Sequence, residues 1–201
     1  MKCSNRVCLA VVLSAMCFAS VGNAAFIEVA EGTDDSLIGA TSSFGSTPKA
    51  NAVDGDLSTP YASNTSGTSF WRISLEGDHL IDEVIFWGRD HGTESVRNRT
   101  NNIVVQVRDV GNTVVWESDV LLPWDGVDPL DKIDPGFGPH VVDVPDGIVG
   151  ENIVIRKIQA DGDGMGLGEV QVWAMAVPEP SSVVLIGLGA SVAVILSRRW
   201  R

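Results

Sequence analysis

The central part of this 201-residue sequence has no cysteine and few basic residues. All three cysteines lie within the first 17 residues, so the segment 25–176 can form neither a disulfide nor a thiolate metal site. This segment contains 25 of the 26 acidic residues but only nine of the 14 basic ones, which gives it a net charge of about −16. Because proteins bind nucleic acid by neutralising phosphates with Lys and Arg, this charge excludes nucleic acid as a partner.

Charge is also scarce near the N-terminus. Lys2 and Arg6 precede an uncharged, largely apolar run from Val7 to Val21, and small residues follow up to Ala25. A basic start, an apolar run and a small-residue cleavage site are typical of a secretory signal peptide. The sequence therefore predicts export, with residues 1–24 removed.

The C-terminal segment 177–201 carries a second apolar run. Pro178, Glu179 and Pro180 come first, seventeen uncharged residues follow at 181–197, and three arginines stand among the last four residues. Seventeen residues are at the short limit for a transmembrane helix, and the arginines would stay in the cytoplasm. A plain membrane anchor is one interpretation.

The order of these three parts resembles the PEP-CTERM sorting signal of bacteria that make extracellular polysaccharide. The resemblance implies that an exosortase cuts near Pro178, Glu179 and Pro180 and that the short helix is then lost. The protein would be anchored in the inner membrane only transiently, through this helix, and would end at the cell surface or in the extracellular matrix.

Between the two ends, the segment 25–176 reads as a single all-β domain. Short runs rich in Val, Ile, Thr and Trp alternate with Gly, Pro, Asp and Asn, and no run keeps a helical period. The predicted strands are 69–75, 79–87, 102–108, 112–118, 140–144, 151–158 and 168–174. Their number and spacing indicate an antiparallel β-sandwich or jelly roll, with a hairpin turn at Gly111 and Asn112.

Four segments of this domain resemble the discoidin or coagulation factor 5/8 type C family, whose fold is the galactose-binding-like jelly roll. They are Ala40–Ser43, Asn51–Thr59, Phe70–Leu75 and Gly168–Val172. The resemblance implies a non-catalytic module with sugar-binding loops at one end. A structural or adhesive surface protein without a sugar pocket is the alternative function, and a hydrolase is the less favoured one.

The resemblance also implies one structural Ca²⁺. Its ligands would be the backbone oxygens of Asn51, Asp56 and Gly168 and side-chain oxygens of Asp54, Thr59 and Glu169. Calcium takes six to eight hard oxygen ligands, and a Gly between two Asp residues permits the tight turn that such a site needs. An ordinary Asx turn at Asp54 remains the alternative.

The sugar site implied by the resemblance falls on the loop 87–99. Arg89, Asp90, His91 and Arg97 can hydrogen-bond the hydroxyls of a glycan from the extracellular polysaccharide or a cell surface. The loop departs from the fucose-binding pattern, because Arg89 and Asp90 are adjacent and no His occurs from 50 to 78. A solvated loop whose charges pair locally is the other interpretation.

Two tryptophans are predicted to lie in the core. In the run 70–75, apolar and polar residues alternate, so Trp71 should face inward and Arg72 outward. Trp173 is interpreted in the same way. The alternative for Trp71 is an exposed platform for a sugar ring.

Overall fold

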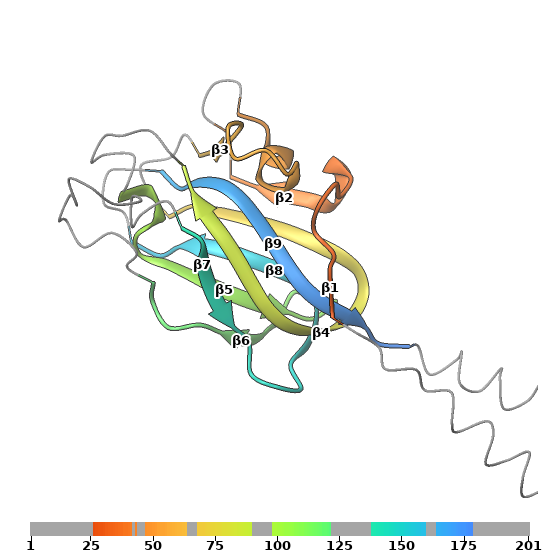
Figure 1. Cartoon of the computed structure of the whole chain (residues 1–201). Helices are drawn as coiled ribbons and strands as arrows, with labels where there is room; N and C mark the ends of the chain where they lie inside the picture. Colours follow the sequence, from red (N-terminus) through yellow and green to blue (C-terminus); the bar gives the residue numbers. More distant parts are fainter. Residues whose placement is uncertain are drawn as a thin grey trace, which may run out of the picture.

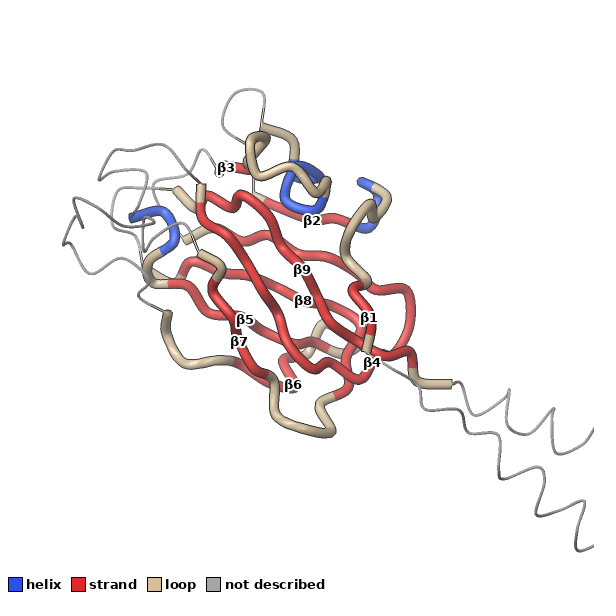
Figure 2. The backbone as a smooth tube through the Cα atoms, in the orientation of Figure 1, coloured by secondary structure: helices blue, strands red, loops and turns tan. Residues whose placement is uncertain are grey.

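The computed structural model describes residues 26–41, 43, 47–63, 68–89, 98–121, 138–159 and 164–178. Strands dominate these residues, and the helical parts are short 3₁₀ turns (Figure 2). The strands are β1 Ile27–Glu28, β2 Ile38–Ala40, β3 Tyr61–Ala62, β4 Phe70–Gly88, β5 Ile103–Arg108, β6 Val114–Glu117, β7 His140–Asp143, β8 Val149–Lys157 and β9 Gly166–Ala176. The 3₁₀ turns are η1 Asp35–Leu37, η2 Lys49–Val53 and η3 Asn98–Thr100.

All pairings between these strands are antiparallel, and together they build two layers (Figure 1). One layer contains β1, β9, the second half of β4 and β7, with β3 at the start of β9. The other layer contains β2, the first half of β4, β8, β5 and β6. The antiparallel β-sandwich predicted from the sequence is confirmed.

β4 joins the two layers. The sequence predicts separate strands at 69–75 and 79–87, whereas the structure has one 19-residue strand that bends between them. Glu76 and Gly77 have φ angles of 54° and 114° at the bend. Such angles favour glycine, and they turn the chain without ending the strand. His79 pairs with Gly150 of β8 and with Ala176 of β9, so the layers meet here.

The core lies between the layers and contains Trp71, which is fully buried. Its Nε1 donates a hydrogen bond to the Lys49 carbonyl oxygen at 2.9 Å. The core prediction for Trp71 is therefore confirmed. The corresponding prediction for Trp173 is wrong: its neighbours Val172 and Ala174 are buried in the core, and because side chains alternate along a strand, Trp173 stands half-buried on the outer face.

The predicted hairpin forms between β5 and β6. Asn112 has a φ of 63°, its N–H donates to the Asp109 carbonyl oxygen, and the Thr113 N–H donates to Asp109 Oδ1. Ile103, Val105 and Val107 of β5 belong to the core, as their alternation predicts. The sequence misses β1, β2 and β3, which have at most three residues each and show no period.

The described residues contain no helix that is long and apolar enough to cross a membrane. The predicted signal peptide 1–24 and the predicted helix at 181–197 lie outside the described residues.

Candidate functional site

The first candidate site surrounds Glu169, near the start of β9. Trp87 pairs with Glu169 but Gly88 pairs with Leu167, so Gly168 forms a bulge in β9. A Cβ atom on Gly168 would stand 2.6 Å from the Gly88 carbonyl oxygen, so only glycine fits this position. After the bulge, Val170 and Val172 point into the core, and Glu169 points away from it.

A tight turn over residues 54–59 lies against Glu169. The N–H of Gly55 donates to Glu169 Oε2 at 3.1 Å. Within the turn, Thr59 Oγ1 is 2.6 Å from Asp54 Oδ2 and 3.0 Å from the Asp56 carbonyl oxygen. The N–H of Asp56 donates to Asp54 Oδ1 at 2.9 Å, as in an Asx turn. Carboxylate, hydroxyl and carbonyl oxygens thus gather beside one buried acid.

The electrostatics of Glu169 are unfavourable for a free carboxylate. Its side chain is only 4% exposed, and no ion pair with Lys or Arg reaches it among the described residues. Burial raises the pKa of Glu169 to about 7; the N–H of Gly55 opposes this shift, and the negative charge of Asp54 adds to it. A cation between the two carboxylates would remove this penalty.

The donor set fits a calcium ion. Within the described part of the chain, no three Asp, Glu, His or Cys side chains gather as a metal cluster. A site here would have two carboxylates, Asp54 and Glu169, and would take its other ligands from neutral oxygens. Calcium accepts such mixed sets of hard oxygen ligands.

The structure brings four of the six predicted calcium ligands into this hydrogen-bonded arrangement. Asp54, Asp56 and Thr59 are linked within the turn, and Glu169 is linked to it through Gly55. Asn51 lies in η2, which packs on β9, and Gly168 is the bulge residue beside Glu169. The residues of the Asx turn are thus among those of the predicted calcium site.

The second candidate site is a pair of arginines where β4 ends and β9 begins. A Cβ atom added to Gly166 would lie 3.2 Å from the Cβ of Arg89 and 3.4 Å from the Cβ of Arg99. Glycine at 166 therefore makes room for two arginine side chains from different segments of the chain.

The guanidinium groups of this pair are poorly satisfied. Arg89 Nε, Arg99 Nε and Arg99 Nη1 are buried and have no hydrogen-bond partner among the described residues. Burial, and then the positive charge of Arg99, lower the pKa of Arg89. Because buried polar groups in native proteins are almost always hydrogen-bonded, these N–H groups are suited to a bound ligand that carries oxygen acceptors.

Of the four predicted sugar-binding residues, only Arg89 is in the described part of the structure. Asp90, His91 and Arg97 lie outside it. The sequence prediction misses Arg99, which η3 places beside Arg89. Its position in the same basic segment, two residues after Arg97, is the signal that could have identified it.

Sequence comparison identifies the C-terminal end of the chain. Residues 176–201 match the PEP-CTERM protein-sorting motif, which confirms the prediction made from Pro178, Glu179 and Pro180. No curated protein is significantly similar to the chain in sequence.

Solved structures resemble the domain although their sequences differ. A Streptococcus pneumoniae fucose binding module, SpX-3, superposes with a TM-score of 0.56 at 18% identity over 73% of this chain and 96% of its own. The family 32 carbohydrate-binding module of C. perfringens NanJ, in complex with galactose, gives 0.51 at 18% identity over 74% and 98%. A fucolectin from striped bass serum gives 0.52 at 16% identity over 73% and 49%.

These likenesses confirm the jelly-roll fold predicted from the four sequence segments. The chain therefore joins a jelly roll of the galactose-binding-like fold to a PEP-CTERM sorting motif at residues 176–201.

Proposed function

We propose that this protein is an exported, non-catalytic module that binds carbohydrate at the end of its jelly roll where Arg89 and Arg99 meet, which we call the loop end. The observation behind this function is the Arg89 and Arg99 pair, whose buried N–H groups have no partner in the part of the chain that the structure describes. Sugar hydroxyls and ring oxygens are the acceptors that such groups need. The binding of fucose or galactose by modules of the same fold supports the assignment to carbohydrate.

A glycan array followed by calorimetry on the best ligand tests this function. Arg89→Gln and Arg99→Gln should each weaken binding about tenfold, because hydrogen bonds from charged groups contribute roughly 1.5–3 kcal/mol. Ile27→Glu is the control: it makes the same change in net charge at a residue that is 58% exposed on β1. If both arginine variants bind as the unmodified protein does, the sugar is held elsewhere.

The proposal includes one structural calcium ion held by Asp54, Glu169 and the neutral oxygens around them. The buried carboxylate of Glu169 and the acceptors of the turn support it. The ion would link the turn 54–59 to β9, and its role would be structural and not catalytic. Glu169 is three residues from Gly166, so this link would also stabilise the part of β9 beside the arginine pair.

We also propose that the module works at the cell surface or in the extracellular matrix, on the polysaccharide there, after exosortase processing near Pro178–Pro180. The sorting motif at 176–201 supports this location. Intact mass spectrometry of protein from the native host should show a chain that begins near Ala25 and has lost Trp200. A surface form that retains Trp200 would make the C-terminal segment a permanent anchor.

A further inference from the structure

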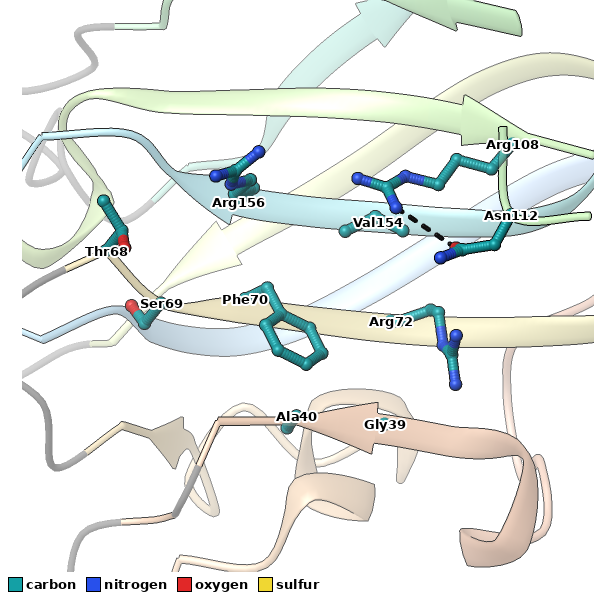
Figure 3. Close-up of a pocket in the computed structure, with 10 residues that line it drawn as sticks. All are labelled: Gly39, Ala40, Thr68, Ser69, Phe70, Arg72, Arg108, Asn112, Val154 and Arg156. Carbon is teal, nitrogen blue, oxygen red and sulfur yellow. Dashed lines mark hydrogen bonds between the residues drawn. The ribbon is translucent and has the colours of Figure 1, made fainter. Parts of the chain in front are cut away.

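A groove of about 450 Å³ lies on the outer face of the second layer (Figure 3), and neither Arg89 nor Arg99 lines it. It crosses β2, the first half of β4, β8 and the β5–β6 hairpin. The lining residues with side chains suited to a ligand include Ser69, Phe70, Arg72, Arg108, Asn112 and Arg156. None of them belongs to the proposed calcium or loop-end sites.

The strand register fixes the three arginines on one face. Phe70 is directly opposite Arg156, and Arg72 is opposite Val154. Arg108 of β5 is opposite Asn152, two residues from Val154 along β8. Neighbouring strands are about 4.8 Å apart and alternate residues about 6.6 Å apart, so the three side chains start within a short distance of one another.

Two polar groups in this groove are buried without a partner. Ser69 is 2% exposed, and within the described ranges neither its Oγ nor the buried Nε atom of Arg72 has a hydrogen-bond partner. A Cβ atom on Gly39 would lie 3.3 Å from both Nε and Nη2 of Arg72. The absence of a side chain at position 39 therefore lets the Arg72 guanidinium pack against β2. The groove thus has donors in place that the protein itself does not use.

The charge of the groove is opposite to that of the domain. Three of the nine basic residues of segment 25–176 line it, in a domain with a net charge of about −16. No Asp or Glu is among the described lining residues. Arg108 is held in place by Gln106 and by Asn112 Oδ1 at 3.1 Å, the bond drawn in Figure 3. Arginine presents a planar fork of donors that matches a carboxylate.

The remaining lining groups suit a sugar ring. Phe70 is 39% exposed, and its ring lies between Arg72 and the Ser69 end of the groove (Figure 3). An aromatic face packs on the C–H side of a pyranose, while Ser69, Thr68 and Asn112 can bond hydroxyls. An aromatic face, neutral hydrogen-bonding groups and several guanidinium groups match one ligand class: a sugar that carries a carboxylate.

We propose that this groove is a second carbohydrate site, which binds an acidic polysaccharide through its uronic-acid residues. Arg72 and Arg156 pair with the carboxylates and Phe70 supports the ring between them. The site does not depend on the loop-end function, and a chain too long for the groove would extend beyond it along the same sheet face.

Calorimetry with oligogalacturonate tests the proposal on the exported chain, with fully methyl-esterified oligogalacturonate as the uncharged analogue. The acid should bind and the ester should bind at least about tenfold more weakly, since esterification removes the charge-assisted hydrogen bonds. Arg72→Gln, Arg156→Gln and Phe70→Ala should each weaken binding of the acid. Gly39→Ala should weaken it too, with every charge unchanged, because it displaces the Arg72 guanidinium.

Ile27→Glu is the matched control, since it changes the net charge equally on the other layer and should leave binding unchanged. Equal losses in Ile27→Glu and Arg72→Gln would overturn the proposal by showing general electrostatic attraction, as would equally tight binding of duplex DNA. No binding of the acid, or equal binding of the ester, would overturn it as well. Neutral-sugar binding by the Arg72→Gln protein reports separately on the loop-end function, which can fail or hold without affecting this result.

Discussion

The interior between the two layers and the arginine-lined surfaces differ in how their polar atoms are satisfied. In the interior, Trp71 donates to the Lys49 carbonyl oxygen and the Tyr61 hydroxyl donates to the Thr41 carbonyl oxygen, each at 2.9 Å. Burial raises the pKa of Tyr61 to about 12, so this hydroxyl stays a neutral donor. Folding alone completes these hydrogen bonds.

On the outer face and at the loop end, folding leaves bonds unmade. Arg72, Arg89 and Arg99 each bury at least one guanidinium N–H that finds no partner among the residues described by the structure. A buried donor without a partner raises the free energy of the folded protein. A ligand that supplies an acceptor removes this cost. The interior therefore determines the stability of the domain, and the arginine-lined surfaces are suited to recognition.

The largest expected effect is in the interior. Trp71→Ala should lower the free energy of unfolding by about 3–5 kcal/mol, because it removes a large, fully buried side chain and its hydrogen bond. Trp173→Ala should cost clearly less, since Trp173 is half-buried on the outer face. Denaturant unfolding of both variants measures the difference. Equal losses would mean that the outer face of β9 contributes as much to stability as the core does.

Calcium should give the next largest effect. At a free concentration one hundred times Kd, a bound ligand stabilises the folded state by about 2.7 kcal/mol, which for a domain of this size raises Tm by several degrees. Mg²⁺ at equal ionic strength should substitute poorly, because it needs a smaller octahedral shell. Asp54→Ala and Glu169→Ala should each abolish the calcium-specific part. The same Tm in Ca²⁺, Mg²⁺ and chelator would leave Asp54 as the start of an Asx turn only.

The stability of the calcium-free protein should depend on pH through Glu169. Burial raises the folded-state pKa of Glu169 from 4.5 to about 7, so between these values the folded protein binds more protons than the unfolded chain. The contribution of Glu169 to stability is therefore full below pH 4.5 and is lost as the pH rises through about 7. In chelator, Tm should fall over this interval more steeply in the unmodified protein than in Glu169→Gln. Calcium should remove the difference in slope, and parallel curves in chelator would contradict the shift.

The smallest effect on stability is expected at the unpaired arginines. Arg99→Gln should lower the free energy of unfolding by less than about 1 kcal/mol or should increase it. The substitution removes buried donors that have no partner among the described residues. Arg108→Gln should be more destabilising, because Arg108 bonds Gln106 and Asn112. Thermal unfolding compares the two. A greater loss for Arg99→Gln would show that its guanidinium supports the fold.

Sequence by itself determined the β-sandwich, the sorting motif and the inward position of Trp71. Alternation along strands is a local property, and a residue's side of the sheet follows from it wherever the strand is regular. β9 is regular from Val170 to Ala174, so the outward position of Trp173 follows from the same alternation, and the core prediction for Trp173 departed from this pattern. The sorting motif at 176–201 is likewise recognised from the order of its residues, without any contact between distant segments.

Tertiary structure alone decided which polar groups meet and which remain unpaired. Glu169 lies against Gly55 across 114 residues, and Arg89 and Arg99 come together because Gly166 leaves space for both. The groove of Arg72, Arg108 and Arg156 exists because three strands align their outer faces in one register. These contacts between distant residues depend on long-range strand pairing and on burial. The order of charged residues along the chain contains information on neither.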